Sequence, residues 1–297
     1  MPSQDGVVSA DLEQLVLTSE EAVNRFGGRW TLDKLEMVRQ YLSGYTTALK
    51  NKRFQLMYID AFAGTGKFED SSGETHDGSA TIAIETVPGF ERLMFIEKRK
   101  SRCDALRVLA DQHPDRQIEI IQGDANQELR KICGTFNRAQ YRAVLFLDPF
   151  GLDVHWTTLE AIRRTEAIDV WYLCSFSGLY RQMARDSRKV DADKDAAITR
   201  FFGTDAWRDE LYERVPTGDL FGDDRRQRLS LDAVREFVTR RLKSLFPAVL
   251  APKTIYFAAP NGKRGAPAFD LYFAVSNPSP KAIGPARRIA GHILKAL

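Results

Sequence analysis

The chain has 297 residues, of which 43% are hydrophobic and 28% are charged. A chain of this composition can bury a sizeable core, which excludes collagen-like, mucin-like and largely disordered proteins. Its 43 basic and 40 acidic residues leave a formal net charge of +3, which permits a nucleic-acid partner without requiring one.

Targeting and metal-binding signals are missing from the sequence. The start, MPSQDGVVSADLEQ, has no basic residues followed by an apolar run, and no stretch reaches the roughly 18 apolar residues of a membrane span. We therefore expect a cytoplasmic protein without a membrane partner. Because Cys103, Cys133 and Cys174 form no CxxC pair, neither disulfides nor a metal site is expected.

Residues 1–30 read as a polar N-terminal arm, and 31–297 as one domain. A helix is predicted over 32–49, where apolar residues recur at helical spacing. Short apolar runs rich in strand-forming residues then alternate with helical patterns. These runs cover residues 54–62, 93–97, 117–122, 143–148 and 168–175. The alternation indicates a parallel sheet with helices on both faces.

The alternation stops at residue 176. Residues 176–252 look helical and amphipathic, and they are too long for a plain crossover, so we expect a helical insertion. Residues 254–259 and 270–275 predict two further strands, and the Gly- and Pro-rich linker between them favours an antiparallel pair. The predicted fold is α/β and Rossmann-like, with a mainly parallel seven-stranded sheet and an antiparallel last strand.

The first predicted strand runs into an acid and a glycine turn, YIDAFAGTG. Asp60 precedes Gly64 and Gly66, and glycines in such a turn let the backbone approach a ligand closely. The third glycine of a dinucleotide fingerprint and the hydroxyl residue of a P-loop are both absent at the required spacing. A nucleotide-dependent dehydrogenase or phosphotransferase is therefore disfavoured. The acid before the turn suits a cationic or neutral ligand.

Acidic residues also end the next two strands. The carboxylate of Glu97 can accept both hydroxyls of a ribose, although a surface glutamate paired with Lys98 or Arg99 is an alternative. Asp124, in GDAN, can accept an exocyclic amine of adenine, or it can cap the helix that starts before Gln127. Ligands of open α/β sheets lie at the carboxyl ends of the strands, where both acids are expected.

The fourth strand ends in Asp148-Pro149-Phe150-Gly151. A carboxylate, a free carbonyl group and a flat ring together suit the exocyclic amine of a nucleobase. The alternative is a structural turn with a buried phenylalanine. His155 lies close enough in the sequence to line this pocket, but a structural role is favoured.

Together these segments resemble a class I S-adenosylmethionine-dependent methyltransferase. DAFAGTG is similar to its first cofactor motif, FIEK to its ribose-binding acid, GDAN to its adenine loop and LFLDPFG to its fourth motif. Amino-methyltransferases of nucleic acids usually have Asn/Asp-Pro-Pro-Tyr/Phe in the fourth motif. Here Phe150 takes the second proline position and Gly151 the aromatic one, as in tRNA guanine-N2 methyltransferases, so the target base stays open.

A longer set of segments, WTLDKLEMVRQYL, YIDAFAGTG, DGSA, FIEK, LDPFG, RFFGTDAW and LYFAVSNP, resembles the bacterial three-Cys-motif partner proteins. The resemblance implies S-adenosylmethionine as cofactor, a three-cysteine-motif partner protein and no metal, because the sulfonium carries its own activation. It implies that the methionine half of the cofactor is surrounded by Asp60, Ala61, Phe62, Gly64 and Gly66, and that Lys34 pairs with its carboxylate. It further implies Glu97 for the ribose, Asp124 for the adenine, and Asp148, Pro149 and Phe150 as the catalytic residues that receive the acceptor.

The expected activity is methylation of an exocyclic amine of a nucleobase in RNA or DNA. The insertion, with its arginines and Trp207, is the expected recognition element, because phosphates attract basic residues and bases stack on aromatic ones. The alternative is a non-catalytic module of a bacterial two-gene system, which binds the cofactor or the three-cysteine-motif protein.

Overall fold

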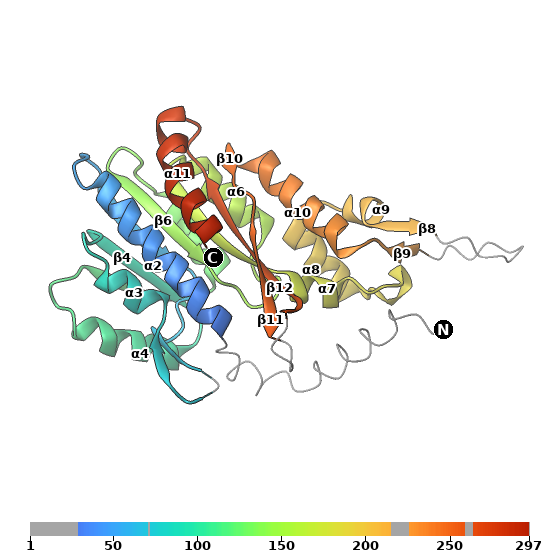
Figure 1. The fold of residues 1–297 in the computed structure, drawn as a ribbon, viewed down its shortest axis with the longest axis horizontal. Coiled ribbons are helices and arrows are strands. Elements are labelled where there is room, and N and C mark those ends of the chain that lie inside the picture. The colour runs from blue at the N-terminus through green and yellow to red at the C-terminus, as the bar shows by residue number, and fades with distance from the viewer. Residues whose placement is uncertain (1–28, 71, 215–225, 259–263, 297) are drawn as a thin grey trace, which may run out of the picture.

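The computed structural model describes residues 29–70, 72–214, 226–258 and 264–296 (Figure 1). The predicted N-terminal arm therefore lies outside the described residues up to position 28. Residues 29 and 30 already belong to the first described helix, α2 (Arg29–Leu49), which begins three residues before the predicted one.

One central sheet organises the chain. Across the sheet the strands follow the order β12 (Arg264–Val275), β7 (Ile168–Ser175), β6 (Tyr141–Leu147), β1 (Gln55–Asp60), β4 (Arg92–Glu97) and β5 (Ile118–Gln122). The strands from β7 to β5 are parallel, and β12 is antiparallel to β7. Two short strands, β10 (Ala248–Val249) and β11 (Lys253–Ala258), pair with successive parts of β12 and share the last position. The predicted α/β, Rossmann-like fold with a mainly parallel sheet and an antiparallel last strand is confirmed, whereas the sheet has eight strands in place of the predicted seven.

Both faces of the sheet are buried, which explains the continuous apolar runs in the sequence. Tyr58 and Trp171 belong to the core on one face, whereas their neighbours Ile59 and Val170 belong to the core on the other. The first face is covered by α2, α3 (Ser79–Glu85), α4 (Lys100–Asp111) and α11 (Pro280–Ala296), and the second by α5 (Ala125–Gly134) and α6 (Trp156–Thr165). None of the helices in the described ranges has the length and apolar character to cross a membrane.

Three aromatic rings fix helix α2 on the sheet. The ring centroid of Tyr41 lies 5.2 Å from that of Trp171 and 5.0 Å from that of Phe273. Lys34 is two helical turns before Tyr41 and therefore lies on the same, sheet-facing side. The aromatic packing thus places a lysine over the carboxyl ends of the strands.

The segment between β7 and β10 projects from one end of the sheet (Figure 1). It contains α7 (Phe176–Gln182), α8 (Ala192–Phe202), α9 (Trp207–Glu210), α10 (Leu231–Leu245) and a hairpin of β8 (Tyr212–Arg214) with β9 (Arg226–Arg228). The helical reading of the sequence missed this hairpin, because strands of three residues have no measurable period.

The polar segment 67–77, expected to be a loop, is also a hairpin, of β2 (Lys67–Glu69) and β3 (Thr75–Asp77). Its turn is closed by Asp70, whose Oδ1 accepts the backbone N–H groups of Ser72 at 2.8 Å and Glu74 at 3.1 Å. Such side-chain closure lets a polar sequence form a hairpin without apolar strands.

Candidate cofactor and acceptor site

The predicted site residues come from five elements that meet at the carboxyl edge of the sheet. Asp60 ends β1 and Glu97 ends β4, while Asp124 lies two residues after β5 and Asp148 directly follows β6. Lys34 reaches this edge from α2. Parallel pairing of β5, β4, β1 and β6 is what brings these distant positions together.

Asp60 is a fully buried acid with three hydrogen-bond donors. Ser79 Oγ donates to its Oδ2 at 2.6 Å, the Tyr58 hydroxyl donates to the same oxygen at 3.4 Å, and the Phe62 N–H donates to Oδ1 at 3.2 Å. Burial raises the pKa of Asp60 to about 6, while the bonds from Ser79 and Phe62 favour its ionised form. Near pH 6 the carboxyl group of Asp60 is therefore present in both protonation states. A cation beside it would favour the ionised form.

Glu97 ties the glycine turn to the end of β4. Its side chain is 7% exposed, and it accepts the backbone N–H groups of Gly64 at 3.1 Å and Arg99 at 2.8 Å. The guanidinium of Arg102, in the first turn of α4, lies 3.8 Å from Oε2. The alternative of a surface glutamate is therefore wrong. Glu97 is a buried carboxylate that shapes the turn after β1.

The two glycines of the turn have different surroundings, although both have positive φ angles, +63° for Gly64 and +80° for Gly66. A Cβ at Gly66 would lie 2.6 Å from the Leu109 side chain, and the Gly66 carbonyl accepts hydrogen bonds from Gly78 and Thr81. A Cβ at Gly64 would meet nothing within 4 Å. Gly66 therefore serves packing, whereas Gly64 presents open backbone that a ligand can approach.

Asp124 is the N-cap of α5. Its Oδ1 accepts the backbone N–H groups of Asn126 at 3.1 Å and Gln127 at 3.2 Å, which is the capping role considered from the sequence. Its Oδ2 lies 4.0 Å from Lys98 Nζ. Capping occupies one oxygen, so the other still can accept an amine.

Lys34 and Asp148 form an ion pair, with 2.5 Å between Nζ and Oδ2. Lys34 is only 5% exposed, and its ammonium group contacts the acceptor motif. Its pairing with the cofactor carboxylate, which the resemblance implies, stays a prediction. Asp148 also disfavours ionisation of Asp60, whereas Lys34 favours it. The residues expected for cofactor and acceptor are thus electrostatically linked.

Phe150 is 52% exposed, so the alternative of a buried phenylalanine is wrong. The preceding Pro149 is buried and Gly151 has a φ of +56°, which turns the chain away and leaves the ring at the surface. The Arg102 guanidinium lies 5.8 Å from the ring centroid. This arginine was not predicted, and its place five residues after Glu97 gives no recognisable signal.

Asn126 is a second residue that the sequence analysis missed. Its buried amide accepts the His155 N–H at 2.9 Å and the Thr158 hydroxyl at 2.8 Å, and it donates to the Asp153 carbonyl at 2.6 Å. It thereby joins the start of α5 to the loop that carries Phe150. The contact with His155 uses its backbone N–H group, so the structural role expected of its side chain stays a prediction.

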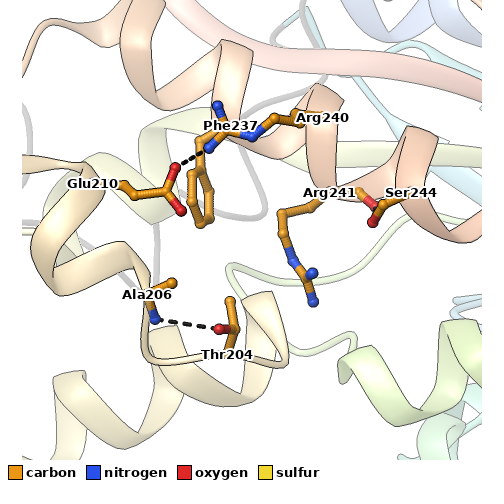
Figure 2. A pocket seen from close by; sticks show the side chains of 7 residues that line it. All are labelled: Thr204, Ala206, Glu210, Phe237, Arg240, Arg241 and Ser244. Carbon is orange, nitrogen blue, oxygen red and sulfur yellow. Dashed lines mark hydrogen bonds and ion pairs between the residues drawn. The ribbon is translucent and has the colours of Figure 1, made fainter.

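A separate cavity of about 250 Å³ lies in the insertion (Figure 2). Arg240 in its wall pairs with Glu210, and Arg241 donates to the Phe202 carbonyl at 2.9 and 3.1 Å. Its charged groups are thus already engaged, and no residue from the strand ends contributes to it. We therefore place the candidate functional site at the carboxyl edge of the sheet and not in this cavity.

Trp207, expected to take part in recognition, is 2% exposed, and its indole N–H donates to Thr199 Oγ1 at 3.0 Å. It packs inside the insertion, so its predicted role in stacking on bases is wrong. The sequence could not distinguish a core tryptophan from a surface one.

Comparison with known proteins supports the fold. No family model and no curated protein matches the chain. A protein from Legionella pneumophila, with family model DUF519, is 11% identical over 91% of this chain and 92% of its own, with a TM-score of 0.51. At this identity the similarity shows the fold alone.

Two further structures are similar at lower TM-scores. The putative methyltransferase YhhF of Escherichia coli is 10% identical over 80% of this chain and 86% of its own, with a TM-score of 0.36. The N-terminal domain of EvdMO1, solved with SAH bound, is 9% identical over 80% and 79%, also with a TM-score of 0.36. These two scores are too low to support a conclusion about this chain.

Proposed function

We propose that the protein is an S-adenosylmethionine-dependent methyltransferase that acts on an exocyclic amine of a nucleobase in RNA or DNA. The observation that carries the proposal is the pairing of neighbouring strands β1 and β6. One ends in Asp60 and the open backbone at Gly64, and the other is followed by Asp148 and the exposed ring of Phe150. A ligand turn and an acceptor site therefore lie side by side.

The residues at the end of β1 and β4 fit the cofactor. Gly64 leaves room for the methionine half against the backbone, Asp60 offers a buried acid beside it, and Glu97 retains lone pairs for ribose hydroxyls. Ala61, Phe62 and Gly66 complete the turn, and Asp124 has one oxygen left for an adenine amine. The bound cofactor supplies an electrophilic methyl group.

Asp148 has the position and the charge to orient an amine. Its Oδ2 is held by Lys34, whereas within the described ranges no hydrogen bond to Oδ1 is present. An amine that donates one N–H to Asp148 Oδ1 has its lone pair fixed in direction. Phe150 gives the attached base a flat surface. A base in a duplex would first leave the stack.

The test is methyl transfer from tritiated S-adenosylmethionine to RNA and to DNA, by wild type and by Asp148→Asn. The variant should lose transfer and keep cofactor binding, since Asp148 contacts the acceptor and not the cofactor. Asp111→Asn, an exposed acid at the end of α4, is the matched control and should act like wild type. Full transfer by Asp148→Asn would contradict the proposal.

A second candidate is a cofactor-binding or partner-binding module without catalysis. The observation in its favour is that Asp148 already has an ion-pair partner. Cofactor binding together with no transfer to any nucleic acid would favour this candidate. The three-cysteine-motif partner protein stays a prediction, and co-purification of the two proteins is the assay for it.

A further inference from the structure

Two aromatic side chains in the described part of the chain are exposed, Phe150 at 52% and Tyr180 at 41%. They follow the carboxyl ends of β6 and β7, which are neighbouring parallel strands. Each ring has a guanidinium beside it: Arg102 lies 5.8 Å from the centroid of Phe150, and Arg228 lies 3.4 Å from that of Tyr180. The proposed acceptor ring therefore has a counterpart on the adjacent segment.

The backbones that carry the two rings are in contact. A Cβ built on Gly178 would lie 3.1 Å from the Cα of Gly151. Gly151 directly follows Phe150, and Gly178 stands two residues before Tyr180. Tyr180 therefore belongs to the same edge of the sheet as the proposed acceptor site.

The ring of Tyr180 is held in a defined way. Arg228, on β9, donates from Nη1 to the Tyr180 carbonyl at 2.9 Å and also to the Met183 carbonyl. These bonds hold the guanidinium against one face of the ring, while Tyr180 stays 41% exposed. Tyr180 is therefore not a core residue: its ring is exposed and is held in place by Arg228.

Two basic segments that are far apart in the sequence meet here: one has Arg181, Arg185, Arg188 and Lys189, and the other has Arg226 and Arg228. The backbone N–H of Arg228 donates to the Arg185 carbonyl at 2.8 Å. Gln227 forms an isolated antiparallel β-bridge with Asp186. Arg181 and Lys189 are exposed in the same segment, and within the described ranges neither forms an ion pair. Two cationic side chains that have no ion-pair partner within the described ranges therefore lie in the same chain segment as Tyr180.

We propose that Tyr180, backed by Arg228, is a second stacking site, which binds the base next to the target base in a single-stranded nucleic acid. Arg181 and Lys189 contact the phosphates of that strand. This inference rests on the proposed function. Bases in a duplex are stacked on each other, so a protein ring can take one only from a single strand. Stacking tolerates every base, so this site recognises strandedness more than sequence.

The test is fluorescence anisotropy with a fluorescein-labelled single-stranded RNA of mixed sequence, the DNA of the same sequence, and each annealed to its complement. The full chain is used, with S-adenosylhomocysteine present. Both single strands should bind more tightly than their duplexes, and the tighter of the two identifies the kind of nucleic acid. Tyr180→Ala should weaken single-strand binding by about 5- to 150-fold, the range for one lost stacked base. Tyr180→Phe should restore it.

Charge is tested separately with two exposed arginines. Arg181→Ala should lower the slope of log affinity against log salt by about 0.7, the value for one phosphate contact with a single strand. Arg288→Ala is the control and should leave the slope unchanged. Arg288 is an exposed residue of α11, which packs on the opposite face of the sheet from α7. This pair of variants keeps the inference testable if Tyr180→Ala does not fold.

Unchanged affinity of a folded Tyr180→Ala, equal binding of single strand and duplex, or equal effects of Arg181→Ala and Arg288→Ala would overturn the inference. If S-adenosylhomocysteine binds and no nucleic acid does, the inference is wrong and the cofactor part of the proposed function stands. If the cofactor does not bind and the Tyr180-dependent binding of single strands persists, the proposed function is wrong and the stacking site stands.

Discussion

Lys34 Nζ lies 2.5 Å from Asp148 Oδ2, although 114 residues separate the two in the chain. The pair joins the first described helix to the acceptor motif, and the lysine is almost fully buried. Asp148 disfavours the ionisation of Asp60 and Lys34 favours it, so the two effects on this acid oppose each other. The pair therefore links the first described helix to the acceptor motif, while burial dominates the pKa of Asp60.

The first prediction concerns this pair. Lys34→Met and Asp148→Asn should each lower the free energy of unfolding, and the double variant should lose less than the sum. A coupling energy of about 1–3 kcal/mol is expected for a hydrogen-bonded ion pair of which one partner is buried. Urea unfolding of the four proteins measures it. Additive losses would show that the two side chains do not interact in solution.

The second prediction separates the two glycines. Gly66→Ala should destabilise the protein by about 2–4 kcal/mol, because positive φ strain adds to overlap with Leu109. Gly64→Ala should cost only the strain, about 1–2 kcal/mol, but its methyl group enters the open space where the cofactor is proposed to lie. Thermal melting and calorimetric titration distinguish the two effects. Undiminished cofactor affinity in Gly64→Ala would argue against this cofactor position.

The third prediction concerns Glu97. Glu97→Gln should weaken cofactor binding by about 1–3 kcal/mol, the range for hydrogen bonds to a charged group. The amide also cannot accept from both Gly64 and Arg99, so one backbone N–H loses its partner. Glu69→Gln, an exposed glutamate at the end of β2, is the matched control. Equal affinities for the two variants would remove Glu97 from the cofactor site.

The fourth prediction is a pH dependence caused by Asp60. Burial raises its pKa from 3.8 to about 6, so between these values the folded protein binds more protons than the unfolded chain. Its free energy of unfolding should therefore fall as the pH rises through this window, by about 3 kcal/mol from this group. Asp60→Asn should lack that decline. Curves of stability against pH that run parallel for the two proteins would contradict the assignment.

The same ionisation should appear in cofactor binding. A cationic ligand beside Asp60 favours the carboxylate, so affinity for S-adenosylmethionine should increase as the pH rises through about 6. Asp60→Asn should bind with an affinity that hardly changes over this range. Calorimetric titrations at several pH values measure it, and an affinity of wild type that does not change with pH would contradict the prediction.

The sheet was predictable because its strands are buried on both faces. Continuous apolar runs ending in Asp60, Glu97 and Asp148 identify parallel strands and the edge where their acids meet. The Gly- and Pro-rich linker likewise predicted that the last two strands form an antiparallel pair. These features depend on local composition, which one sequence displays.

Features that depend on long-range contacts were not predictable. Nothing in the sequence shows that Lys34 pairs with Asp148, because the contact results from how α2 packs through Tyr41. The same holds for Trp207, whose burial depends on the packing of helices within the insertion. The role proposed for Tyr180 was not predictable either, because the position of its ring depends on its contact with Arg228, which is distant in the sequence.

The most direct test of the central claim is calorimetric titration of the purified protein with S-adenosylmethionine, S-adenosylhomocysteine, NAD and ATP in parallel. We expect micromolar binding of the first two and none of the others, since the turn at Gly64 lacks the spacing of a phosphate-binding loop. Binding of NAD or ATP in place of S-adenosylmethionine and S-adenosylhomocysteine would contradict the assignment of the site.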